Sequence, residues 1–167
     1  AIMGLCVASC YIGLGCYQHH RAFEAQATWA KHQGQEITRA RVMPTLGHLF
    51  AWRGIYLSKQ KLYFTRIQAP LFKKVTVKQV MSRIRFTADS LPDTVKYSVT
   101  LYNNFNVFEW FTDDYLFSVS STPLILCDAR YVLNFAQPKC MWGIKFPLGD
   151  NAKAYASFIR NIYISHL

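Results

Sequence analysis

The pattern of apolar and polar positions is clearest in residues 42–72, where two aromatic-rich runs are separated by the polar sequence SKQK at 58–61. Aromatic and β-branched residues favour the half-buried surface of a sheet. A short polar break between two such runs is typical of a β-hairpin. Pro44 and Pro70 bracket the runs, and proline is disfavoured in a central ladder. We predict that this hairpin is the nucleus of an antiparallel sheet, with Arg53 in the middle of its first strand.

Further strands are predicted after the hairpin. Residues 73–88 favour a strand or an irregular connection, while residues 115–119, 124–133 and 140–146 are short apolar runs bounded by turn residues. The last segment, residues 152–167, fits either a strand or a helix. The predicted fold class is therefore α+β, with a mainly antiparallel β-sheet and one inserted helix.

The inserted helix is predicted over residues 90–112. Ser90 is the candidate N-cap, and Pro92 lies in the first turn, where the missing N–H of a proline is tolerated. The sequence Thr112-Asp113-Asp114 ends the helical pattern. Apolar residues recur at helical spacing and would form the buried face: Val95, Val99, Tyr102, Phe105, Phe108 and Phe111.

The chain begins with eighteen residues that carry no charge, followed by a basic cluster at 19–21. As a helix, this run would extend roughly 27 Å, about the thickness of the hydrocarbon core of a bilayer. We expect residues 1–20 to form a transmembrane helix, the last span of a longer protein. It would continue into an amphipathic helix over residues 21–34, within a soluble C-terminal α+β domain over 21–167. A signal peptide and a buried helix of a soluble protein are the alternatives.

Positive charge is unevenly distributed. The net charge is +10, and residues 37–88 contain eleven Lys and Arg but no Asp or Glu. Such a face attracts an anionic lipid surface or an acidic protein, although a solvated surface is the alternative. Nucleic acid is an unlikely partner, because the spacing matches no nucleic-acid-binding module. The positive-inside rule places this side of the membrane in the cytoplasm. The basic face consists of Lys59, Lys61, Arg66, Lys73, Lys74 and Lys78.

The five cysteines include no C-x-x-C pair. Cys6, Cys10 and Cys16 lie in the uncharged N-terminal run, and Cys127 and Cys140 lie in strand-like segments. The odd number indicates reduced, buried thiols in a cytosol-facing protein rather than a disulfide framework. The sequence leaves a Cys127–Cys140 bridge open.

Candidate chemistry is limited. No Walker, G-x-G-x-x-G, G-x-S-x-G or H-E-x-x-H motif is present, and the histidines are not spaced as metal ligands. Asp128 and Arg130 would share one face of a strand and form an ion cluster with Arg53, as a structural network or an anion-binding site. A further alternative is a soluble ligand-binding domain in which three tryptophans line an aromatic pocket. The candidate site has no metal ligand and no assigned catalytic residue, and it comprises Trp52, Arg53, Trp110, Asp128, Arg130 and Trp142.

Three blocks of sequence resemble a known family. They read like "P-T…LWR…Y", "F-x-W-F-S-D-G-Y" and "G-D-x-R-Y…L-W-G-I", in the order found in the LexA-binding, inner membrane-associated hydrolases of bacteria. Members of that family are regarded as membrane-bound, metal-dependent hydrolases. The matching residues are 44–45 and 50–56 with 63–64 and 70–72, then 108–116, then 128–131 with 141–144.

The resemblance implies the C-terminal, cytoplasm-facing domain of an integral protein of the bacterial inner membrane, with an accessory role in binding a partner or substrate. The metal ligands of the family belong to an early segment reading like "D-x-x-T-H", which has no counterpart in this sequence. The resemblance therefore assigns no cofactor to this chain and places a divalent metal in an upstream part, so whether the chain is an enzyme stays open. The alternative is a non-enzymatic, membrane-anchored interaction domain whose basic face binds anionic lipid or an acidic partner.

Overall fold

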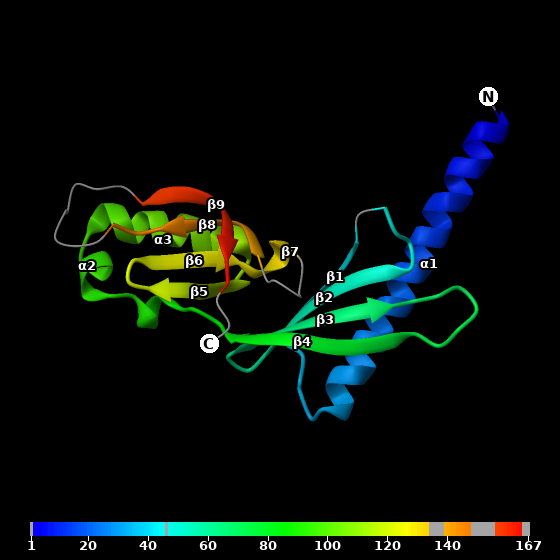
Figure 1. Cartoon of the computed structure of the whole chain (residues 1–167), viewed down its shortest axis with the longest axis horizontal. Coiled ribbons are helices and arrows are strands. Elements are labelled where there is room, and N and C mark those ends of the chain that lie inside the picture. Colours follow the sequence, from blue (N-terminus) through cyan, green and yellow to red (C-terminus); the bar gives the residue numbers. More distant parts are fainter. Residues whose placement is uncertain (1, 46, 134–138, 148–155, 165–167) are drawn as a thin grey trace. The chain divides into compact units, whose positions relative to one another are not determined.

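The computed structural model describes residues 2–45, 47–133, 139–147 and 156–164. The chain divides into two compact units, Ala1–Ser82 and Arg83–Leu167, which we call unit 1 and unit 2. Each unit combines an antiparallel sheet with a helix (Figure 1). The α+β class is confirmed, but the strands form two sheets rather than one. Apolar patterning predicts single strands and does not specify which strands pair with one another.

Unit 1 combines one long helix, α1 (Ile2–His32), with a four-stranded sheet. The predicted hairpin is confirmed, because β2 and β3 pair antiparallel around a turn at Lys59, where φ is 53°. Pro44 ends the edge strand β1, where a missing N–H is tolerated. The strands lie in the order β1 (Arg39–Pro44), β2 (Ala51–Ser58), β3 (Lys61–Gln68) and β4 (Thr76–Ile84).

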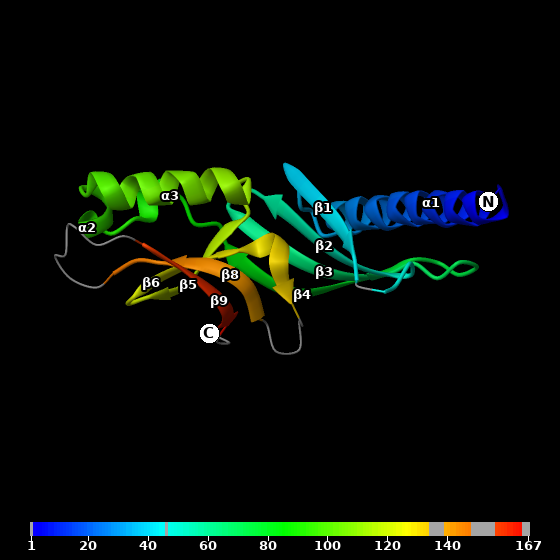
Figure 2. The same cartoon turned by 90° about the horizontal axis from the view of Figure 1, so that it is seen from above.

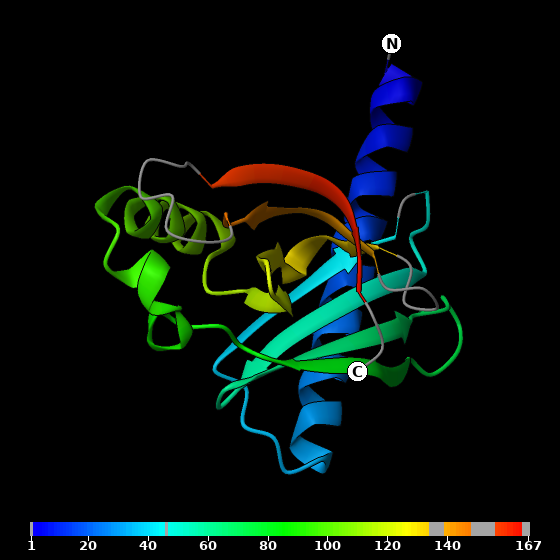
Figure 3. The same ribbon diagram turned by 60° about the vertical axis from the view of Figure 1, so that its left-hand side comes forward.

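The second half of α1 lies across one face of this sheet (Figure 3). The sheet satisfies the two buried amides of the helix: Gln18 Nε2 donates to the carbonyl of Ala69 at 3.0 Å, and Gln26 Nε2 donates to the carbonyl of Ile55 at 3.3 Å. A buried amide that loses its partner costs about 1–3 kcal/mol, so these bonds fix the helix along the sheet. The buried residues of α1 form a single stripe with a spacing of four: Gln18, Ala22, Gln26 and Ala30.

The first half of α1 projects past the sheet (Figures 1 and 3). None of residues 2–17 is buried. The predicted helices over 1–20 and 21–34 are one continuous helix, and Gly34 follows it with a φ of 67°. In the described part of the chain, no helix is long and apolar enough to cross a membrane. The spanning character predicted for residues 1–20 is therefore corrected; three glycines and the polar end of the run lower its hydropathy.

Unit 2 packs α3 (Val99–Thr112) on a five-stranded sheet (Figure 2). Leu101, Phe105 and Phe108 of α3 form the core with side chains from the sheet and from the segment before the helix: Leu91, Val95, Leu116, Leu124, Leu126, Ile144 and Phe146. The strand order is β5-β6-β8-β7, and β9 pairs with β8. The strands are β5 (Leu116–Ser121), β6 (Leu124–Asp128), β7 (Val132–Leu133), β8 (Lys139–Lys145) and β9 (Ser157–Tyr163).

Two predicted elements of unit 2 are interrupted. The helix expected over residues 90–112 is divided into a short α2 (Asp93–Lys96) and α3, because Ser98 restarts the helix as N-cap and accepts the N–H of Leu101 at 3.4 Å. Val99 is consequently 78% exposed rather than buried. The strand expected over 124–133 is broken by a 3-10 turn, η2 (Ala129–Tyr131). The ambiguous C-terminal segment contains the strand β9.

Substitution of Gly54 tests the packing of α1 against the sheet. A Cβ atom at Gly54 would collide with the side chains of Gln26 and Thr65, which hydrogen-bond to each other at 3.3 Å. We expect Gly54→Ala to lower the free energy of unfolding by about 1–3 kcal/mol in urea titrations. The matched control is Gly4→Ala, where no atom lies within 4 Å and stability should be unchanged or rise by up to about 1 kcal/mol. Equal stability of the two variants would contradict the packing described.

Candidate functional site

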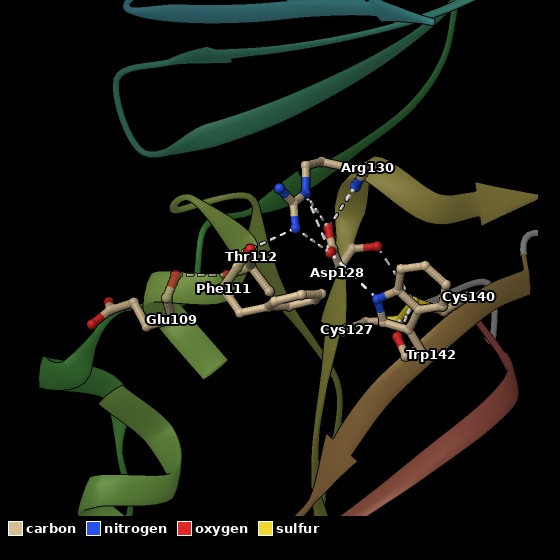
Figure 4. A network of polar contacts seen from close by, with 8 residues as sticks. All are labelled: Glu109, Phe111, Thr112, Cys127, Asp128, Arg130, Cys140 and Trp142. Carbon is tan, nitrogen blue, oxygen red and sulfur yellow. Dashed lines mark hydrogen bonds and ion pairs between the residues drawn. A yellow bond between two sulfur atoms is a disulfide. The ribbon is translucent and has the colours of Figure 1, made fainter. Parts of the chain in front are cut away.

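A buried ion pair lies at the C-terminal end of α3 in unit 2 (Figure 4). Asp128, the last residue of β6, is fully buried and accepts the backbone N–H of Arg130 at 3.0 Å, which caps η2. The guanidinium of Arg130 donates to the same carboxylate from Nη2 at 2.7 Å and from Nε at 3.0 Å. On β8, the indole Nε1 of Trp142 donates to it at 3.4 Å. The carboxylate thus accepts four N–H donors.

Arg130 also satisfies the end of α3. Its Nη2 donates to the carbonyl of Phe111 at 2.6 Å, one of the last-turn carbonyls that have no partner within the helix. A positive charge is favourable at a helix C-terminus, and the guanidinium lies 5.5 Å from the ring centroids of both Phe111 and Tyr131. The hydrogen bonds that Arg130 donates to Asp128 raise the pKa of Arg130 above its usual value. The pair therefore ties β6, β8 and α3 together.

This geometry supports a structural network rather than a catalytic or anion-binding centre. A fully buried carboxylate with four donors has no oxygen face left for a substrate. The charge of Arg130 is neutralised by Asp128, so it offers little attraction to an incoming anion. Among the described residues, no group of three or more His, Cys, Asp and Glu could hold a metal ion.

A cleft of about 550 Å³ opens beside Trp142. This volume lies within the range of small-molecule sites, which are mostly apolar with a few polar groups. The ion pair orients two walls of the cleft, because Trp142 is hydrogen-bonded to Asp128 and the carbonyl of Phe111 is hydrogen-bonded to Arg130. The lining residues are Phe111, Met141, Trp142, Phe158, Arg160 and Asn161.

Three of the six predicted site residues are brought together: Asp128, Arg130 and Trp142. Trp110 is 81% exposed on α3 and does not line the cleft. Trp52 is buried in unit 1, where its Nε1 donates to the carbonyl of Leu49 at 3.0 Å. Trp142 therefore lines this cleft without Trp110, and a pocket shared by the three tryptophans stays a prediction.

Arg53 lies in the sheet of unit 1, opposite Met43 on β1 and Arg66 on β3. Burial lowers the pKa of Arg53 below its usual value. Asp128 belongs to unit 2, and the pairing of Arg53 with Asp128 stays a prediction.

The cleft residues Phe158 and Arg160 were not predicted from the sequence. They lie on one face of β9, with Arg160 opposite Trp142 and Phe158 opposite Ile144 on β8. In a strand, residues 158 and 160 point to the same face, and this spacing could have predicted that their side chains lie together. The prediction requires residues 152–167 to contain a strand, which their sequence left ambiguous.

The cysteines differ from the prediction of reduced, buried thiols. Cys127 on β6 and Cys140 on β8 form a disulfide with a Cα–Cα distance of 6.3 Å, because adjacent strands bring the two buried side chains together (Figure 4). Cys6, Cys10 and Cys16 are free, but they are exposed on α1 rather than buried. Sequence spacing alone cannot show which strands become neighbours.

The predicted basic residues are all exposed, and they are spread along the sheet of unit 1. Lys59 and Lys61 lie at the β2–β3 turn, whereas Lys73 and Lys74 lie in the β3–β4 connection at the other end of β3. Charge also differs between the units: unit 1 has eleven Lys and Arg against two Glu, and unit 2 has eight against seven acidic residues. The positive charge is therefore a property of unit 1.

Comparison of the chain with family models, with curated proteins and with solved structures finds no match. The resemblance to the membrane-bound hydrolases therefore remains a prediction. Two of its three blocks coincide with the ion-pair region, since they contain Phe111, Asp128, Arg130 and Trp142.

A pair of double-mutant cycles tests the buried network. For Asp128→Asn and Arg130→Met we expect a coupling energy above about 2 kcal/mol, because a buried charge left without its partner is strongly destabilising. The matched pair is Arg85–Asp114 in the same unit, 3.8 Å apart, with side chains 25% and 35% exposed. The cycle of Arg85→Met and Asp114→Asn should give about 1 kcal/mol or less. Similar coupling energies in urea unfolding would show that the Asp128–Arg130 pair does not organise unit 2.

Proposed function

We propose that the chain is a membrane-associated accessory domain that binds a partner or substrate, as part of a membrane-bound hydrolase of the family it resembles. The observation that carries this proposal is the first half of α1, which is uncharged and exposed, and which continues without a break into the half fixed on the sheet. The role assigned to the described units is binding rather than catalysis.

The exposure of this half-helix in water is energetically unfavourable. Burying a large aliphatic side chain is worth about 1.5–3 kcal/mol relative to leaving it exposed, and continuous exposed apolar surfaces mark sites of interaction with protein or membrane. Lipid or the apolar helices of a membrane part would remove this surface from water. The side chains concerned are 55–83% exposed: Ile2, Met3, Leu5, Val7, Tyr11, Ile12 and Tyr17.

The family resemblance supports a shared scaffold more than a shared reaction. Its later blocks supply the ion pair, the end of α3 and the wall of the cleft. Its first block supplies the β2–β3 hairpin on which α1 packs. These positions would be retained to hold the fold, and the metal chemistry of the family would reside in its upstream segment.

We propose the bacterial inner membrane as the location. The high positive charge of unit 1 supports the cytoplasmic side, following the positive-inside rule. The Cys127–Cys140 disulfide supports the opposite side, because disulfides are rare in the cytosol. The redox state of these two cysteines in cells distinguishes the two orientations.

A second candidate function is ligand binding in the cleft of unit 2. The supporting observation is an aromatic cleft of about 550 Å³ whose described lining carries one charged side chain, Arg160, beside Phe158 and Trp142. Such a site would suit a small apolar ligand that carries an acidic group. It is compatible with the accessory role and would supply its substrate-binding part.

A charge placed on the exposed half of α1 tests the membrane association. We expect the wild-type chain to float with phospholipid vesicles in density gradients, and Val7→Glu to reduce the bound fraction, with affinity falling more than about tenfold, because a carboxylate replaces an apolar contact with lipid. The matched control is Thr28→Glu, which adds the same charge at an exposed position on the packed half of the helix and should bind as the wild type does. Equal binding of Val7→Glu and Thr28→Glu would refute the proposed role of this half-helix.

A further inference from the structure

The connection between β3 and β4 is fastened to α1 at the point where the helix leaves the sheet. We call residues 69–74 the anchor loop. Gln18 Nε2 donates to the carbonyl of Ala69 at 3.0 Å, while Arg21 donates to the carbonyls of Pro70 at 2.9 Å and Lys73 at 2.8 Å. Three backbone carbonyls of the loop are thus held by two side chains of one helical turn. The loop has a defined position relative to the exposed half of α1.

The side chains of the anchor loop face solvent in an unusual combination. Phe72 is 93% exposed and Leu71 is 37% exposed, and the next two residues are the exposed Lys73 and Lys74. An aromatic ring at this exposure contributes little to the core of unit 1. No acidic residue occurs between residues 37 and 88 of the sequence. Apolar and cationic groups therefore lie side by side on a fixed loop.

The β1–β2 connection lies against the same part of α1 (Figure 1). A Cβ atom at Gly15 would lie 3.8 Å from Leu49 Cδ2 in this connection, and His19 Nε2 donates to the carbonyl of Val42, in the adjoining strand β1, at 3.2 Å. The next residue in that connection, Phe50, is 43% exposed. Both connections at this end of the sheet therefore flank α1 around residues 15–21, where the uncharged segment ends.

We propose that the anchor loop binds the headgroup region of an anionic bilayer, with Phe72 and Leu71 among the upper acyl chains and Lys73 and Lys74 at the lipid phosphates. This inference rests on the proposed membrane association and adds the lipid class and the contacting residues. Aromatic rings and basic side chains occupy the membrane–water interface. The loop would mark the level at which α1 meets the membrane surface.

Anionic lipid is favoured over an acidic protein for a geometric reason. A bilayer presents phosphates and acyl chains at one level around an inserted helix, and the anchor loop presents its lysines and its exposed apolar residues at the base of such a helix. An acidic protein would account for Lys73 and Lys74 but would leave Phe72 and the whole of residues 2–17 exposed. Each lysine near an anionic surface strengthens binding by about fivefold.

The test is vesicle binding by the full chain at physiological ionic strength, with phosphatidylcholine alone and with phosphatidylglycerol added. We expect Lys73→Ala with Lys74→Ala to weaken binding to the anionic vesicles by roughly tenfold to thirtyfold, with little change on neutral vesicles. Phe72→Ser should weaken binding to both. All three residues are exposed, so the variants should retain the urea midpoint of the wild type.

The matched control is Lys59→Ala with Lys61→Ala, which removes the same charge at the opposite end of β3. The eight residues of β3 separate the two sites by about 25 Å, well beyond the screening length at physiological salt. The control should change binding by about twofold or less. An equal loss in both double variants would show a diffuse effect of net charge and overturn the role of the loop.

The remaining outcomes separate the two proposals. If the wild type binds neutral and anionic vesicles equally and the Lys73/Lys74 variant matches it, the anchor loop does not recognise anionic lipid, while the membrane association stands. If the wild type binds neither kind of vesicle, the membrane association itself is wrong and the inference fails with it.

Discussion

Polar contacts from one face of α1 determine where the helix lies on unit 1. Gln18, Arg21 and Gln26 reach four carbonyl groups of the sheet and of the anchor loop. Apolar packing alone would allow the helix to slide, because hydrophobic contacts have little directionality. Hydrogen bonds to defined carbonyls do not allow this, since a shift of one turn would leave buried amides without partners. These hydrogen bonds fix the position of α1 along the sheet. They therefore determine how much of the uncharged segment projects past it.

In unit 2, polar contacts of the Asp128–Arg130 pair hold the sheet and the end of α3 together. Asp128 ends a strand, and Arg130 satisfies a carbonyl at the end of α3. Without the pair, the buried carboxylate of Asp128 and the carbonyl at the end of α3 would lose hydrogen-bond donors. The role of the pair is therefore structural. It also orients Phe111 and Trp142, two walls of the cleft. A binding cleft built on such a support would have side chains fixed before a ligand arrives, which lowers the entropy cost of binding.

The parts that were predicted from the sequence are those determined by local pattern. The β2–β3 hairpin, the continuous N-terminal helix and the position of β8 follow from periodicity and turn residues. The interruptions at Ser98 and at residues 129–131 depend on side-chain capping within a tertiary context, which a pattern of apolar positions does not contain. The disulfide and the cleft depend on strand order, so residues such as Arg160 could not be connected to Trp142 beforehand. The run of positive charge could be read from the sequence. That its lysines lie at the two ends of β3 could be known only once the strand pairing was established.

We propose that lipid covers the first half of α1, and the cysteines of this half provide the most direct test. Cys6 and Cys10 are free and exposed on this half, whereas Cys127 and Cys140 are bonded to each other. Labelling with a membrane-impermeant maleimide, read out by mass spectrometry with and without anionic vesicles, reports whether lipid covers these thiols. We expect vesicles to protect Cys6 and Cys10, while a cysteine introduced by Thr28→Cys on the packed half stays reactive. Equal labelling of Cys6 and Cys10 in the presence and absence of vesicles would contradict the account.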